Sequence, residues 1–204
     1  MPNESKSRMQ FKIRRIETLS FIHNEVIRKE VLTVKVKSQL PNMLTYFNLT
    51  LGLLAIVFII SEQYVVSALL IILAAFMDRF DGKLARKLDV ESEFGKELDS
   101  LCDLISFGVA PAILMWSFHM TNMGVWGFAV VALFAISGAY RLAFFNITEF
   151  DGFYMGIPIT LCGGIVALMT LYSANYTTNI YVLGFIMLLL SYAMVTKRIK
   201  LRKR

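Results

Sequence analysis

Residues 78–103 read DRFDGKLARKLDVESEFGKELDSLCD, a polar stretch that includes Asp78, Asp81, Asp99 and Asp103. It lies between two apolar runs, VVSALLIILAAFM at residues 65–77 and LISFGVAPAILMW at residues 104–116. Both runs are typical of membrane helices, so the aspartates are expected at the mouth of a membrane bundle. Carboxylates in that position are costly unless other groups neutralise them, which marks the stretch as a candidate functional site.

The spacing of the polar residues predicts two helix faces that meet. If residues 78–86 end one helix and residues 95–103 begin the next, positions three and four apart share a face in each helix. A short polar turn between two antiparallel helices would then bring the two faces together. The first face would carry Asp78, Asp81, Gly82, Ala85 and Arg86, and the second Gly95, Asp99 and Asp103.

Carboxylates gathered in one place repel one another and take up protons unless cations offset their charge. Hard oxygen ligands favour Mg²⁺ or Mn²⁺ over zinc, and the sequence has no His or Cys set with zinc-ligand spacing. Gly82, Ala85 and Gly95 leave room for a flat or bulky ligand near the backbone, and Arg86 offers a fork for phosphate. The alternative is a solvated, salt-bridged loop, but the acids continue into an apolar helix.

These eight residues resemble the signature of the CDP-alcohol phosphatidyltransferase family, D-x2-D-G-x2-A-R-x8-G-x3-D-x3-D, with every spacing kept. The runs PNMLTYFNLTLGLLA, FGKELDSLCDLISFGVAP, YRLAFFNI and GIPI resemble the bacterial and archaeal members whose acceptor is serine. The resemblance covers roughly residues 40–198. A sister enzyme that makes phosphatidylglycerol phosphate usually reads LDP-x2-D-K where this chain has LDSLCD.

The resemblance implies transfer of the phosphatidyl group from CDP-diacylglycerol to L-serine, with release of CMP, at two divalent cations, Mg²⁺ or Mn²⁺. Asp78, Asp81 and Asp99 would bind one ion. Asp78, Asp99 and Asp103 would bind the second, and both ions would lie at the pyrophosphate. Asp103 would also accept the proton of the serine hydroxyl. A sister activity with glycerol 3-phosphate or an inositol phosphate as acceptor is the alternative.

The resemblance also implies the remaining contacts. Gly82, Ala85 and Gly95 would make room for the cytidine and ribose, while Arg86 and Ser92 would hold the phosphates of CDP-diacylglycerol. Family members pair as homodimers, and a homodimer is therefore expected. Membrane lipids are further expected partners, whereas nucleic acid is not, because a basic arm beside a membrane domain has a simpler use.

Polar residues in two other helices are expected near this site. Asn42 and Thr45 form a polar face near one end of the first apolar helix, where a headgroup or a nucleotide could bind. Asn48 could instead make an ordinary hydrogen bond between helices. We expect Arg141 and Ser106 to contact the acceptor, although Arg141 could also snorkel to the lipid headgroups.

Composition and charge predict an all-α integral membrane protein. Of the 204 residues, 56% are hydrophobic, and the net charge is +6. None of the 21 Lys and Arg residues lies in three candidate loops, 61–64, 118–124 and 173–179. The positive-inside rule therefore places both termini and the acidic stretch on the cytoplasmic side of the cell membrane.

About six transmembrane helices are expected, over residues 42–61, 64–86, 94–117, 125–146, 158–173 and 179–196. Residues 1–40 form a basic segment whose apolar residues recur every three or four positions, which predicts an amphipathic helix at the membrane interface. Residues 41–198 form the membrane domain, and residues 199–204 form a basic cytoplasmic tail. A cation transporter is a remote alternative, but the last two helices contain no Asp, Glu, Lys, Arg or His for an ion path.

Overall fold

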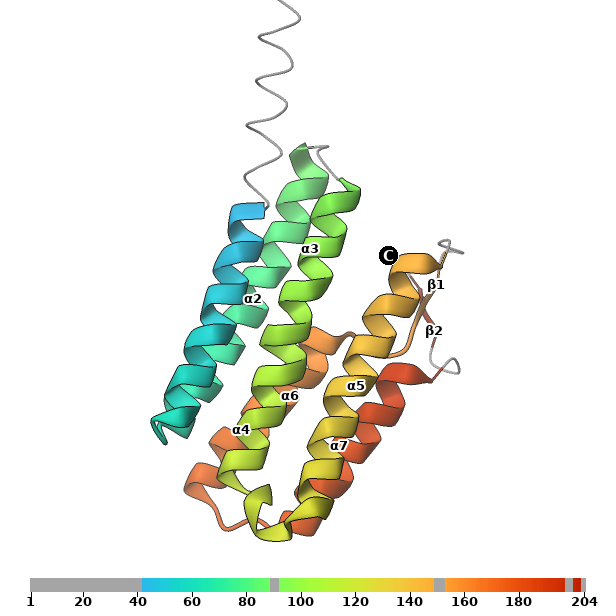
Figure 1. The fold of residues 1–204 in the computed structure, drawn as a ribbon. Helices are drawn as coiled ribbons and strands as arrows, with labels where there is room; N and C mark the ends of the chain where they lie inside the picture. Colours follow the sequence, from blue (N-terminus) through green and yellow to red (C-terminus); the bar gives the residue numbers. More distant parts are fainter. Residues whose placement is uncertain (1–41, 89–91, 149–152, 197–199, 203–204) are drawn as a thin grey trace, which may run out of the picture. The chain divides into compact units, whose positions relative to one another are not determined.

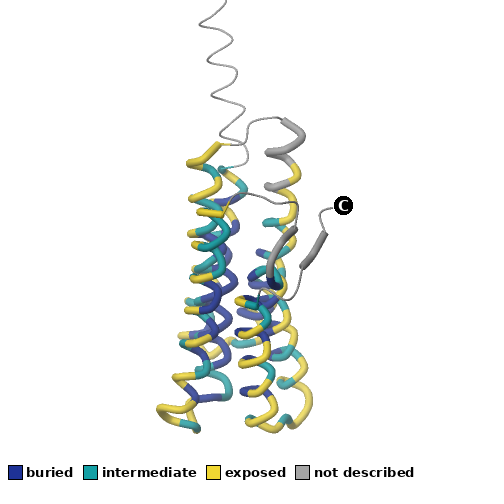
Figure 2. The backbone as a smooth tube through the Cα atoms, turned by 90° about the vertical axis from the view of Figure 1, so that its right-hand side faces the viewer, coloured by how far each residue is buried: buried dark blue, intermediate teal, exposed yellow. Residues whose placement is uncertain are grey.

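The computed structural model describes residues 42–88, 92–148, 153–196 and 200–202. The side chains of residues 81–82, 84–88, 153–155 and 200–202 are not described. The expected amphipathic helix within residues 1–40 lies outside the described residues. The described part is a bundle of helices whose buried residues lie on the faces that meet inside the bundle (Figure 2).

The helices follow one another with short connections (Figure 1). An unlabelled first helix, Asn42–Ile60, is followed by α2 (Tyr64–Leu88), α3 (Glu93–Asp103), η1 (Leu104–Val109), α4 (Ala110–Phe118), η2 (Met120–Met123), α5 (Val125–Ile147), α6 (Ile159–Asn175) and α7 (Ile180–Val195). Helix α5 packs against α7, and α2 packs against α6. Each of the six helices expected from the sequence is present, with ends within two residues of the prediction.

Three helices in the described part are long and apolar enough to cross a membrane: Asn42–Ile60, Glu93–Phe118 and Val125–Ile147. Helices α6 and α7 are apolar but shorter. Many large apolar side chains on the outside of the bundle are exposed, for example Trp126 and Ile136. Such a surface is unfavourable in water and suits a lipid environment.

The rod formed by α3, η1 and α4 changes its helical pitch directly after the acidic stretch. The segment η1 is a π-helix, and the N–H of Ala110 donates to the carbonyl of Ile105, five residues earlier. Pro111, in the first turn of α4, has no N–H to donate, so the helical ladder is loosened at this point. The wide turn of η1 lies directly before this proline.

Close helix contacts depend on small residues. A Cβ atom at Gly163 of α6 would lie 2.7 Å from the carbonyl oxygen of Phe107 in η1. A Cβ atom at Gly52 of the first helix would collide with the hydroxyl of Ser106. Close backbone approach of this kind is typical of helix packing in membranes. It fixes the first helix and α6 against the rod that carries two of the aspartates.

Two short strands, β1 (Phe153–Met155) and β2 (Lys200–Arg202), pair in antiparallel register. A plain basic tail was expected at residues 199–204, so this pair differs from the prediction. The pairing gives hydrogen-bond partners to main-chain groups of β1 and β2. The periodicity of the side chains does not show which main-chain groups will pair in this way.

Candidate metal centre

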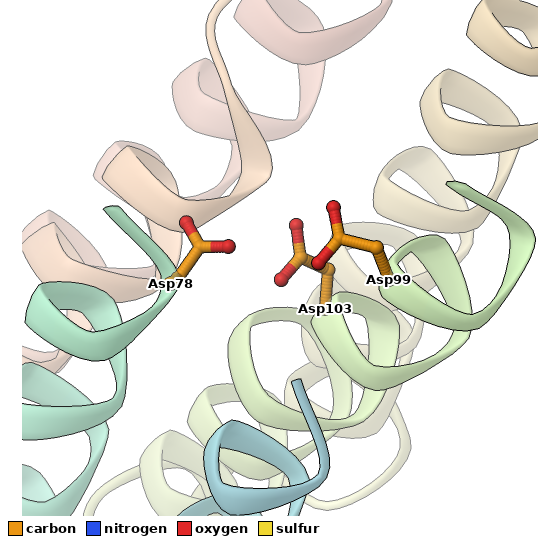
Figure 3. Close-up of side chains that lie close together, drawn as sticks. All are labelled: Asp78, Asp99 and Asp103. Carbon is orange, nitrogen blue, oxygen red and sulfur yellow. The ribbon is translucent and has the colours of Figure 1, made fainter. Parts of the chain in front are cut away.

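Three aspartates from two helices lie together near one end of the bundle. Asp78 belongs to α2, and Asp99 and Asp103 lie one turn apart on α3. Each offers a carboxylate oxygen, and these three oxygens all lie within 4.8 Å of one another. Figure 3 shows Asp78 directed from its helix toward the other two carboxylates. The two faces predicted from the spacing therefore meet at these three acids, while the side chain of Asp81 lies outside the described residues.

Asp103 is held by the first helix. Its side chain is only 8% exposed, and Nδ2 of the fully buried Asn48 donates a hydrogen bond to its Oδ1 at 3.2 Å. The hydroxyl of Ser106 in turn donates to the main-chain carbonyl of Asn48 at 3.2 Å. The expectation of a hydrogen bond between helices at Asn48 is thus confirmed, and its partner is an aspartate of the acidic stretch.

Asp78 is held by α6. The hydroxyl of Thr160, in the first turn of that helix, donates a hydrogen bond to Oδ2 of Asp78 at 3.1 Å. Thr160 was not predicted as a site residue. A single threonine in an apolar helix gives no periodic signal, and only its position directly after the GIPI run hints at a role.

Asp99 differs from the other two acids. Its Oδ1 is buried and has no hydrogen-bond partner among the described residues. A buried polar atom without a partner carries a free-energy cost of about 1–3 kcal/mol, and more for a charged group. An unpaired oxygen beside two further carboxylates fits a divalent cation, since all three donors are hard oxygens. The described residues could therefore hold a metal ion.

The residues expected at the nucleotide fall into two groups. Ser92 caps α3, and its hydroxyl accepts a hydrogen bond from the N–H of Gly95 at 3.0 Å. A Cβ atom at Gly95 would lie 3.3 Å from Oδ1 of Asn42, so these three residues converge. Thr45 is buried one turn further along the first helix. For Gly82, Ala85 and Arg86 the structure gives only the helical backbone of α2.

The two residues expected at the acceptor have different surroundings. Arg141 of α5 lies within electrostatic reach of Asp103, and its Nε is buried without a hydrogen-bond partner among the described residues. Its guanidinium also lies 5.9 Å from the ring centre of Phe145. The Nε of Arg141 therefore lies inside the protein, on the side of the helix that can reach the acidic cluster. Ser106 instead lies in the contact with the first helix, where its hydroxyl is bonded to Asn48.

A polar network that the sequence analysis missed joins α3 to the end of α5. Asn146 donates from Nδ2 to Oε2 of Glu97 at 3.1 Å and to the hydroxyl of Ser100 at 3.0 Å. Nζ of Lys96 lies 3.4 Å from the main-chain carbonyl of Asn146 and donates to it. This network joins the first turns of α3 to the end of α5.

Residues 38–196 match the CDP-alcohol phosphatidyltransferase family. Over 157 residues the chain is 39% identical to a protein of Helicobacter pylori named CDP-diacylglycerol–serine O-phosphatidyltransferase; the match covers 73% of this chain and 66% of the relative, just under two thirds of its length. The protein of that name from Bacillus subtilis is 36% identical, and the match covers 78% of this chain and 87% of the relative. The one from Methanocaldococcus jannaschii is 39% identical, and the match covers 59% of this chain and 54% of the relative. The chain therefore belongs to the CDP-alcohol phosphatidyltransferase family.

Proposed function

We propose that this protein transfers the phosphatidyl group of CDP-diacylglycerol to L-serine, which yields phosphatidylserine and CMP. The observation that carries the proposal is the cluster of Asp78, Asp99 and Asp103 inside an apolar helical bundle. Family membership supports a CDP-alcohol as the donor and an alcohol as the acceptor. The names of the similar proteins support serine as that alcohol.

The metal centre in this proposal holds two divalent cations, Mg²⁺ or Mn²⁺. Asp78, Asp81 and Asp99 bind one ion. Asp78, Asp99 and Asp103 bind the other. When bound, the ions offset the negative charge of the pyrophosphate and of the transition state. The carboxylate oxygens of Asp78, Asp99 and Asp103, which lie within 4.8 Å of one another, and the unpaired Oδ1 of Asp99 support a divalent cation at these three acids.

Asp103 acts as the general base. It accepts the proton of the serine hydroxyl, and the serine oxygen forms a bond to the phosphorus that carries diacylglycerol. The bond from that phosphorus to the bridging oxygen of the pyrophosphate breaks, and CMP leaves with both electrons. The hydrogen bond from Asn48 to Oδ1 orients the Asp103 carboxylate for this role. Arg141 pairs with the serine carboxylate, which orients the hydroxyl toward Asp103.

The donor nucleotide lies against the ends of the first helix, α2 and α3. The convergence of Asn42, Ser92 and Gly95 supports this location, because the absence of a side chain at Gly95 lets two polar side chains approach its backbone. The proposed contacts of CDP-diacylglycerol are Asn42, Thr45, Gly82, Ala85, Arg86, Ser92 and Gly95.

The protein spans the cell membrane six times in this proposal, with the site and both termini on the cytoplasmic side. The apolar outer surface and the distribution of Lys and Arg support this topology. The acyl chains of the donor then stay in the bilayer while its nucleotide reaches water. Residues 1–40 lie at the interface, residues 41–198 form the membrane domain, and residues 199–204 form the tail. The active form is a homodimer.

The test measures CMP release by the purified full-length protein in mixed micelles with CDP-diacylglycerol. Release is expected only when L-serine and Mg²⁺ or Mn²⁺ are both present. Glycerol 3-phosphate and an inositol phosphate serve as comparison acceptors. CMP release with either of these and none with serine would assign the chain to a sister activity of the same family.

A further inference from the structure

We propose that Asn48 and Thr160 are positioning residues of the metal centre, and this inference rests on the metal site of the proposed function. Each donates one hydrogen bond to a carboxylate of the acidic cluster. Each therefore holds one carboxylate of the cluster in a fixed orientation. The two aspartates belong to α2 and α3, whereas the two donors come from the first helix and α6.

Thr160 is well placed to fix Asp78. Its hydroxyl donates to Oδ2 of Asp78 at 3.1 Å across an α2–α6 contact. One turn later on α6, Gly163 lies against the backbone of Phe107 in η1, where even a Cβ atom would be too close. The backbone of α6 is thereby held against the rod that carries the other two acids, and the threonine hydroxyl has little freedom to move away.

Asn48 is held at two points. Its main-chain carbonyl accepts from Ser106, and its Nδ2 donates to Asp103. Gly52, one turn further along, packs directly on Ser106. Asn48, Asp103 and Ser106 are all buried, so the hydrogen bonds form where water does not compete. The amide therefore fixes one orientation of the Asp103 carboxylate.

The chemical nature of the two donors matters. A hydroxyl and an amide orient a carboxylate without cancelling its charge, whereas Lys or Arg in the same places would compete with a cation. Neutral hydrogen-bond partners of this kind tune metal ligands, and their loss typically weakens metal binding about 10- to 100-fold. Asp99, whose Oδ1 has no partner among the described residues, completes the set as the acid with an oxygen left for the metal.

The test compares three substitutions in α6 of the full-length protein. Thr160→Val keeps the shape of the side chain but removes the hydroxyl, and Thr160→Ser retains the hydroxyl. Thr170→Val is the matched control, because Thr170 is buried on the same helix, about 15 Å further along its axis, and its hydroxyl donates to the carbonyl of Val166 within that helix. Mn²⁺ affinity is measured by electron paramagnetic resonance of the free ion.

Thr160→Val is expected to weaken Mn²⁺ binding about 10- to 100-fold, while Thr160→Ser and Thr170→Val bind Mn²⁺ like the unaltered protein. Asn48→Leu, with a similar shape and no donor, is expected to weaken binding in the same range. Thermal unfolding is measured in parallel, and if Asn48→Leu melts far below the unaltered protein, the Thr160 series decides.

Equal Mn²⁺ affinity in Thr160→Val and Thr170→Val would overturn the inference, and so would absence of Mn²⁺ binding by the unaltered protein. The serine-transfer proposal fails separately. Mn²⁺ binding that depends on Thr160, without CMP release in the presence of L-serine, would leave the positioning role intact and remove only the proposed reaction.

Discussion

Two adjacent glycines of α6 provide a sharp test of how the bundle holds the acidic cluster. A Cβ atom at Gly163 would lie 2.8 Å from Cα of Phe107, whereas a Cβ atom at Gly164 would have no atom of the described residues within 4 Å. Both positions lie inside α6, so replacement by alanine brings the same gain in helix propensity, about 0.5–1 kcal/mol. The variants Gly163→Ala and Gly164→Ala therefore differ only in packing.

The size of the effect follows from contact distances. Carbon atoms pack at about 3.5–4.0 Å, so the methyl of Gly163→Ala must separate α6 from η1 by about 0.7–1.2 Å. Overpacking of this kind destabilises a protein by about 1–3 kcal/mol. Thr160 moves with α6, and its hydrogen bond to Asp78, already 3.1 Å long, is lost if it lengthens by about 0.5 Å. Gly163→Ala should therefore lower both stability and metal affinity.

The assay places the two variants side by side in the same detergent, with thermal unfolding and Mn²⁺ affinity as the two measurements. Gly164→Ala is expected to melt at or above the temperature of the unaltered protein and to bind Mn²⁺ equally well. Gly163→Ala is expected to melt lower and to bind Mn²⁺ more weakly. If the two variants match in both measurements, the tight contact of α6 with η1 does not position the site, and the reasoning is refuted.

Three further predictions concern the chemistry. Asp103→Asn should lower the turnover of CMP release about 10²- to 10⁴-fold with little change in melting temperature, because it removes the proton acceptor; near-normal turnover would remove its role as base. Chelation by EDTA should abolish CMP release, and Mg²⁺ or Mn²⁺ should restore it; release that persists in EDTA would exclude a metal-dependent reaction. Arg141→Ala should raise the KM for L-serine about 10-fold or more and leave the KM for CDP-diacylglycerol nearly unchanged. The reason is that a charge-assisted hydrogen bond contributes about 1.5–3 kcal/mol. An unchanged KM for L-serine would place the acceptor elsewhere.

The helices and the acidic face could be predicted because both depend on local periodicity. Apolar runs set where each helix lies, and the spacing of Asp99 and Asp103 fixes them one turn apart whatever surrounds them. The proximity of Asp78 to Asp99 and Asp103 could be predicted because a short connection joins their two helices. These features need no knowledge of how the other helices pack.

The contacts that hold the acids could not be predicted, because they join residues far apart in the chain. Thr160 and Asp78 are 82 positions apart, and Asn48 and Asp103 are 55 apart. One polar residue in an apolar helix does not reveal its partner. Ser106 shows the same limit: its place in the sequence suggested the acceptor, whereas the structure has its hydroxyl bonded to the first helix.

Two features of the backbone could not be predicted from the sequence either. The wide turn of η1 and the β1–β2 pair depend on which main-chain groups find partners, and side-chain patterns carry little information about that choice. A proline such as Pro111 removes one donor from the helical ladder, but the sequence does not specify that a π-helix follows directly after Asp103. Wide turns of this type are frequent at functional sites.

The Mn²⁺ affinities of two variants in α3 test directly whether the acidic cluster binds a metal ion. Asp99→Asn removes one carboxylate of the cluster, whereas Glu97→Gln removes an exposed carboxylate two residues earlier that bonds to Asn146. We expect Glu97→Gln to bind Mn²⁺ like the unaltered protein and Asp99→Asn to bind it at least about 10-fold more weakly. Equal Mn²⁺ affinity in both variants would contradict a metal centre formed by Asp78, Asp99 and Asp103.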